Sequence, residues 1–136
     1  MSEQIPILIV DDDAQLRELL ECTLRLAGFE VHLAEDGPTG LEIARETKVA
    51  FILLDVVMEG MDGLEVLSEL KHDRRTEDIP VFMLTGKSRM GDIEYALENG
   101  ADDYITKPVA LTRLGETLKE KLAKCEEGSK VRGEFK

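Results

Sequence analysis

Five polar residues in this sequence follow short apolar runs, and together they could bind a divalent cation and a phosphate group. Asp11 and Asp12 follow the first run, Asp55 the third, Thr85 the fourth and Lys107 the fifth. Carboxylate oxygens, with no cysteine or histidine nearby, favour hard cations such as Mg²⁺ or Mn²⁺. A hydroxyl donates one hydrogen bond and an ammonium up to three, so the last two residues could hold the oxygens of an anion.

Three carboxylates in one place repel one another unless a cation or a raised pKa relieves the repulsion. Two unit charges ~4 Å apart interact by about 4 kcal/mol at an effective dielectric constant of about 20. Mg²⁺ usually takes one or two carboxylates and completes its shell with water or phosphate oxygens. A metal ion, a hydroxyl and an ammonium around one carboxylate fit a phosphoryl group on that carboxylate, and aspartyl phosphates are established intermediates.

These residues can meet only if the elements that carry them align the ends of the apolar runs. The apolar runs predict strands at residues 5–10, 29–34, 50–54, 80–84 and 103–105. Apolar residues at helical spacing predict helices at residues 14–27, 40–47, 64–72, 90–99 and 111–124. Strands that alternate with helices form a mainly parallel sheet with helices on both faces. Ligands bind such sheets at the carboxyl ends of the strands, where the five polar residues lie.

The first predicted helix shows how the ends of these elements are set. Asp13 stands at the N-cap position and Gly28 at the position that follows the last turn. Leucines recur between them at i, i+3, i+4 spacing, and Cys22 is expected to pack as a small apolar residue.

The composition indicates one domain and excludes several classes of function. The chain has 136 residues, of which 43% are hydrophobic, and a net charge of −12. So acidic a chain is unsuited to binding nucleic acid directly or to lying on an anionic membrane. The longest apolar run is about six residues, far short of the ~20 that span a bilayer. Two cysteines do not make a disulfide scaffold, so we expect a cytoplasmic location.

Four stretches of the sequence resemble the receiver domain of two-component response regulators. They are ILIVDDD at 7–13, LLDVVMEGMDG at 53–63, VFMLTG at 81–86 and GADDYITKP at 100–108. The resemblance covers residues 5–124 and implies a flavodoxin-like (βα)₅ fold, a three-layer sandwich with strand order 2-1-3-4-5. We expect a receiver domain at residues 1–125. The polar residues 126–136 are predicted to be a disordered or frayed tail, with a docking segment as the alternative.

The resemblance also implies a role for each polar residue. Asp55 would be the phospho-acceptor, and Asp11 and Asp12 would be the acidic pair that binds Mg²⁺ together with Asp55. Thr85 would donate a hydrogen bond to the phosphoryl group, and Lys107 would pair with it. The backbone carbonyl of Val57 would be a further metal ligand.

A switch aromatic is the other implied feature. Tyr104 would turn inward as Thr85 moves toward the phosphoryl group, although ordinary packing of a partly buried tyrosine remains the alternative. The resemblance also implies a cis bond between Lys107 and Pro108.

Four residues lie where the family varies. Glu59 stands where a proline often follows the methionine, and Val109 stands where a phenylalanine often follows Lys-Pro. Val57 and Lys87 each lie two residues beyond a site residue, where the family tunes the lifetime of the phosphoryl group. Because a valine cannot orient an attacking water, we expect slow autodephosphorylation.

We therefore predict a signalling switch phosphorylated by a histidine kinase or a phosphotransfer protein, not an enzyme with a substrate of its own. Its partner would be a downstream protein or an output domain. By the same resemblance, the face formed by residues 90–99, 103–105 and 111–124 would bind that partner or a second copy. The alternatives are an interaction module that is not phosphorylated, a Mg²⁺-dependent phosphatase of small molecules, and a flavodoxin-type electron carrier. The acidic run after the first strand opposes the last of these, because it would repel the flavin phosphate.

Overall fold

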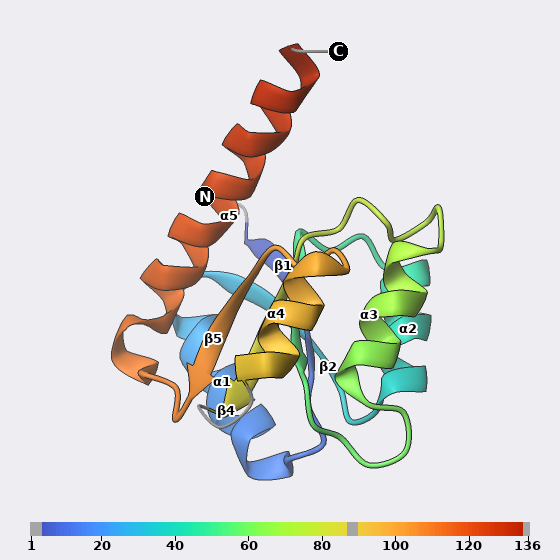
Figure 1. Cartoon of the computed structure of the whole chain (residues 1–136). Helices are drawn as coiled ribbons and strands as arrows, with labels where there is room; N and C mark the ends of the chain where they lie inside the picture. The colour runs from blue at the N-terminus through green and yellow to red at the C-terminus, as the bar shows by residue number, and fades with distance from the viewer. Residues whose placement is uncertain (1–3, 87–89, 135–136) are drawn as a thin grey trace.

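The computed structural model describes residues 4–86 and 90–134, which form a parallel sheet between two layers of helices (Figure 1). The strands are β1 (Ile5–Val10), β2 (Phe29–Ala34), β3 (Phe51–Asp55), β4 (Val81–Gly86) and β5 (Asp103–Lys107). The helices are α1 (Ala14–Leu26), α2 (Gly37–Glu46), α3 (Gly63–Lys71), α4 (Met90–Glu98) and α5 (Leu111–Glu134). The strand order is β2-β1-β3-β4-β5, and the predicted flavodoxin-like fold is confirmed.

Each central strand feeds two cores because its side chains alternate between the faces of the sheet. Leu8 of β1 packs in one core with residues of α2, α3 and α4. Its neighbour Ile9 packs in the other core with residues of α1 and α5. All five residues of β3 are buried, as expected for a strand covered on both faces.

Aspartates occupy the N-cap positions of α1, α2 and α3. Asp13 Oδ1 accepts hydrogen bonds from the backbone N–H groups of Gln15 and Leu16 at 3.0 and 3.2 Å, as predicted for the N-cap of α1. Asp36 caps α2 in the same way, and this helix begins three residues earlier than predicted, at Gly37. Pro38 in the first turn fits this start, since its fixed φ suits a helix and its missing N–H is not needed there.

The last helix is much longer than predicted. α5 continues to Glu134 and projects beyond the sheet (Figure 1), so the prediction of a disordered or frayed tail is wrong as far as that residue. Glu, Lys, Leu and Ala dominate residues 116–127 and favour helix. The ammonium of Lys119 donates to the carbonyl of Ala27 at 2.9 Å, tying α5 to the end of α1. The domain boundary at residue 125 stays a prediction.

The outer side of α1 is more apolar than its packing requires. Only Leu20 and Leu24 of this helix are buried, while Leu19 is 52% and Leu26 is 88% exposed. Cys22 is also exposed, so the prediction that it packs as an apolar residue is wrong. No helix among the described residues combines the length and hydropathy that a membrane-spanning segment needs.

Candidate functional site at the carboxyl edge of the sheet

The register of the parallel strands brings the five predicted residues to one edge. Val10 pairs with Leu54, so Asp11, directly after β1, lies beside Asp55, the last residue of β3. Asp55 pairs in turn with Leu84, which precedes Thr85. Lys107 pairs with Gly86 at the end of β5. Residues separated by almost a hundred positions therefore share one site.

Three carboxyl groups form the centre of this site. Asp11 and Asp55 are buried, at 0% and 4% exposure, whereas Asp12 is exposed. One carboxylate oxygen from each lies within 4.8 Å of the others. Oxygen donors at this spacing, with one side open to solvent, fit a Mg²⁺ ion that keeps some of its water.

Lys107 joins the two buried carboxylates. Its ammonium lies 3.2 Å from Oδ1 of Asp55 and 3.3 Å from Oδ2 of Asp11. Burial and then the charge of Asp11 raise the pKa of Asp55 to about 6, although Lys107 opposes this shift. Burial disfavours the charged ammonium, but the charges of Asp55 and Asp11 outweigh it and raise the pKa of Lys107.

Thr85 lies on β4, and Tyr104 lies near the start of β5, the neighbouring outer strand. Thr85 is buried, and its hydroxyl donates to the carbonyl of Gly86 at 3.2 Å. That weak local bond leaves the hydroxyl free to turn toward another acceptor. Tyr104 is half-buried and packs against the core on the α4 side of the sheet.

The structure shows three contacts at this site that the sequence did not predict. The guanidinium of Arg17 donates to the backbone carbonyl of Asp11 at 2.6 Å, holding the peptide between the two acidic residues. The backbone N–H of Glu59 donates to Oδ2 of Asp12 at 3.1 Å. Gly63 lies against the backbone of Asp55, with no room for a Cβ. The contact of Arg17 could have been predicted, because this basic residue lies one helical turn after the acidic residues that follow β1.

The variable positions are placed as follows. Val57 is 50% exposed, and its N–H donates to Oδ1 of Asp55 at 3.3 Å. Val109 packs partly buried against the core between the sheet, α1 and α5. The bond between Lys107 and Pro108 is cis, as predicted. Lys87 lies outside the described residues.

Comparisons with known proteins agree with this geometry. The family model for the response regulator receiver domain matches residues 7–119. The chain is 41% identical over 122 residues to the phosphate regulon transcriptional regulatory protein PhoB of Pseudomonas aeruginosa, covering 90% of this chain and 53% of that protein. It is also 41% identical over 102 residues to the DNA-binding regulator RpaA of Synechocystis, covering 75% of this chain and 42% of that protein. The chain thus spans about half the length of these relatives.

A solved structure resembles the whole domain. The CheY-like receiver domain protein from Methanospirillum hungatei superposes with a TM-score of 0.83 at 32% identity, covering 93% of this chain and 99% of that one. The similarity therefore extends over nearly all of the chain.

Proposed function

The chain belongs to the response regulator receiver domain family, and on that premise we propose that Asp55 accepts a phosphoryl group and thereby switches a partner-binding face. The observation that carries this proposal is the meeting of three carboxylates, one ammonium and one buried hydroxyl at one edge of the sheet. The phosphodonor is a histidine of a sensor kinase or of a phosphotransfer protein.

Each residue has a part in the transfer. A carboxylate oxygen of Asp55 attacks phosphorus, a P–O bond forms, and the P–N bond to the donor histidine breaks as its imidazole leaves. Lys107 lies within reach of Asp55 and neutralises charge on the phosphoryl oxygens. Asp11, Asp12, Asp55 and the carbonyl of Val57 would hold Mg²⁺, which supplies further positive charge beside those oxygens when bound. The activity of the chain is then limited to this transfer and to the hydrolysis of the aspartyl phosphate.

The switch follows from the new acceptor that phosphorylation creates. Thr85 gives up its bond to Gly86 and donates to a phosphoryl oxygen. As Thr85 moves toward the phosphoryl group, the half-buried ring of Tyr104 turns inward. A local charge thus biases a two-state element, the general principle of phosphorylation switches.

The face formed by α4, β5 and α5 is the surface whose partner binding would change on phosphorylation. Tyr95 and Leu97 of α4 are 54% and 42% exposed. This face would bind a downstream protein, an output domain or a second copy of the chain. The net charge of −12 opposes direct contact of this chain with nucleic acid. The predicted cytoplasmic location remains part of the proposal.

Intact-mass measurement tests the proposal directly. The protein is incubated with acetyl phosphate and Mg²⁺, alongside Asp55→Ala and an EDTA control. We expect one added phosphoryl group that is lost in both. Asp78→Ala is the matched variant, because it removes an exposed aspartate before β4, at the opposite edge of the sheet, and should leave the adduct unchanged.

The opposite result has a definite meaning. If no adduct forms and a beryllofluoride titration leaves the NMR spectrum unchanged, the switch is excluded and the interaction module that is not phosphorylated remains. If an adduct persists in Asp55→Ala, the acceptor is wrongly assigned.

A further inference from the structure

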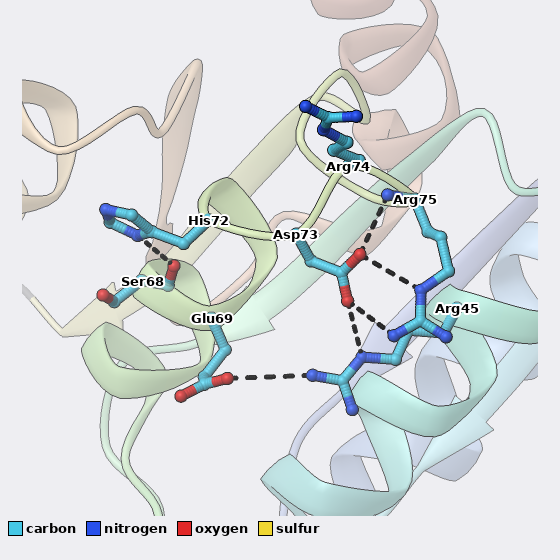
Figure 2. Close-up of a pocket in the computed structure, with 7 residues that line it drawn as sticks. All are labelled: Arg45, Ser68, Glu69, His72, Asp73, Arg74 and Arg75. Atoms are coloured by element: carbon cyan, nitrogen blue, oxygen red, sulfur yellow. Dashed lines mark hydrogen bonds and ion pairs between the residues drawn. The ribbon is translucent and has the colours of Figure 1, made fainter.

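A shallow hollow lies at the edge of the sheet opposite the carboxylates, between the ends of α2 and α3 and the turn before β4. Its volume is about 640 Å³, and its lining residues are Arg45, Ser68, Glu69, His72, Asp73, Arg74 and Arg75. Figure 2 shows these residues around the turn that follows α3. Nothing in the proposed phosphorylation chemistry uses them.

Asp73 holds two of the three arginines in place. Its carboxylate accepts from Nε of Arg45 at 3.0 Å, and from Nε and Nη2 of Arg75 at 3.1 and 2.9 Å. The backbone N–H of Arg75 also donates to it at 2.9 Å, so the turn itself is fixed by the same group. These bonds lower the pKa of Asp73, which therefore remains an anion. The two guanidinium groups are thus positioned before any ligand arrives.

Hydrogen-bond donors remain free on all three arginines. Nη1 of Arg45 and Nη1 of Arg75 take no part in the bonds to Asp73. Arg74 is exposed, and its side chain forms no hydrogen bond or ion pair within the part of the chain that the structure describes. Figure 2 accordingly draws no dashed line to it. Guanidinium donors of this kind suit phosphate oxygens, which they bind in pairs.

The charge balance of the hollow differs from that of the whole chain. Three arginines face two carboxylates there, an excess of one positive charge, whereas the chain carries −12. Oε2 of Glu69 lies 3.7 Å from Nη2 of Arg45. Asp73 forms ion pairs with Arg45 and Arg75, so both carboxylates are paired. The adjoining hollow adds Lys48, Glu46 and Asp78, so the two hollows together carry four positive and four negative groups. An anion of low molecular mass therefore meets less repulsion here than the net charge of the chain suggests.

A second hollow adjoins the first and is partly apolar. It has a volume of about 570 Å³ and shares Arg45, Arg74 and Arg75 with its neighbour. Val49, Ile79 and Pro80 contribute apolar surface to its wall. A ligand with phosphate at the arginines and a flat apolar group over this wall would fill both hollows. Arginine side chains also stack on such flat groups.

We propose that this pair of hollows binds a phosphomonoester of nucleotide size, with its phosphate held by Arg45, Arg74 and Arg75 and its base against Val49, Ile79 and Pro80. The site is separate from Asp55 and does not depend on the proposed phosphorylation. A purely structural role for the arginines would account for the bonds to Asp73, but it leaves Arg74 without a purpose.

An NMR titration of the ¹⁵N-labelled protein tests this site. The probes are AMP, ribose 5-phosphate, adenosine and inorganic phosphate, each in EDTA at constant ionic strength. We expect saturable amide shifts at residues 44–50 and 68–80 with AMP, and weaker binding of the two probes that lack the base. Arg74→Ala should weaken AMP binding about tenfold, the effect of losing one charged hydrogen bond.

Two controls make the outcome decisive. Arg113→Ala removes an exposed arginine from α5 and should leave AMP affinity unchanged. Asp55→Asn should bind AMP as the wild type does, which separates this result from the fate of the phosphorylation proposal. The proposal is overturned if no saturable shift occurs up to about 10 mM AMP. It is equally overturned if adenosine binds as well as AMP, or if both arginine variants lose affinity to the same extent.

Discussion

The ammonium of Lys107 lies 3.2 Å from Oδ1 of Asp55, which joins the ends of β5 and β3 across the strand between them. The same ammonium reaches Asp11 on β1, so one cation holds two buried carboxylates. Burial and then the charge of Asp11 still raise the pKa of Asp55 to about 6, so Lys107 offsets these two effects only in part. The electrostatic energy of the metal-free site is therefore unfavourable, and a bound metal ion or a phosphoryl group would change it.

The raised pKa of Asp55 predicts that the stability difference between Asp55→Asn and the wild type depends on pH. A carboxyl group whose pKa is higher in the folded than in the unfolded chain stabilises the fold when protonated, and that stability is lost as pH rises from about 4 through about 6. Asp55→Asn removes the charge, so the metal-free variant should be more stable than the wild type at about pH 7.5, by at most about 3 kcal/mol. Near pH 4 the difference should vanish.

Urea unfolding in EDTA at both pH values measures this difference. Glu42→Gln, on the exposed side of α2, is the matched control and should change stability little at either pH. Added Mg²⁺ should reduce the difference in free energy of unfolding between Asp55→Asn and the wild type, because it stabilises the wild type. An equal gain at both pH values would show that the ionisation of Asp55 is not its cause.

Gly63 predicts a severe steric effect close to the acceptor. A Cβ at this position would collide with the carbonyl oxygen of Asp55 and lie 2.8 Å from Cα of Val56. Because backbone atoms cannot yield as a side-chain tip can, Gly63→Ala should destabilise the protein by about 3 kcal/mol. Gly91→Ala in α4 meets no atom within 4 Å and should stabilise it by about 0.5–1 kcal/mol. Thermal unfolding of both variants checks the contrast, and similar melting temperatures would contradict it.

Val57 predicts the lifetime of the phosphoryl group. Its side chain is half exposed beside the acceptor and offers no polar atom to an attacking water. Val57→Asn supplies such atoms, so autodephosphorylation should quicken, by about tenfold for one hydrogen bond gained in the transition state. Loss of the phosphoryl adduct with time, followed by intact mass, measures the rate. Val57→Leu should decay as the wild type does, and an unchanged rate in the asparagine variant would refute the explanation.

Tyr104 predicts an optical signal of switching. The chain has two tyrosines and no tryptophan, so Tyr95→Phe leaves Tyr104 as the sole tyrosine. Beryllofluoride with Mg²⁺ should then change the tyrosine fluorescence, because the ring moves from a half-exposed to a buried position. Adding Thr85→Ala should abolish the change without unfolding the protein. If the signal stays constant in Tyr95→Phe while the carboxylate site binds beryllofluoride, Tyr104 only packs.

The order of elements and the membership of the carboxylate site followed from the sequence. Apolar runs that alternate with helical segments indicate a parallel sheet, because each crossover between parallel strands needs a helix. Parallel strands bring their carboxyl ends to one edge of the sheet. Asp11, Asp55, Thr85 and Lys107 each end such a run, so their meeting could be predicted without coordinates. The N-cap at Asp13 was predictable for the same reason, because capping is local.

Other features depend on how the elements pack. Helical spacing reveals a stripe of leucines on α1 but not how much of it the neighbours cover, so the exposure of Leu26 came only from the fold. Burial, which depends on every surrounding element, sets the pKa of Asp55. Arg45 meets Asp73 across 28 residues because α2 and α3 lie side by side. No periodicity in a sequence encodes the distance between two helices, and that distance decides these contacts.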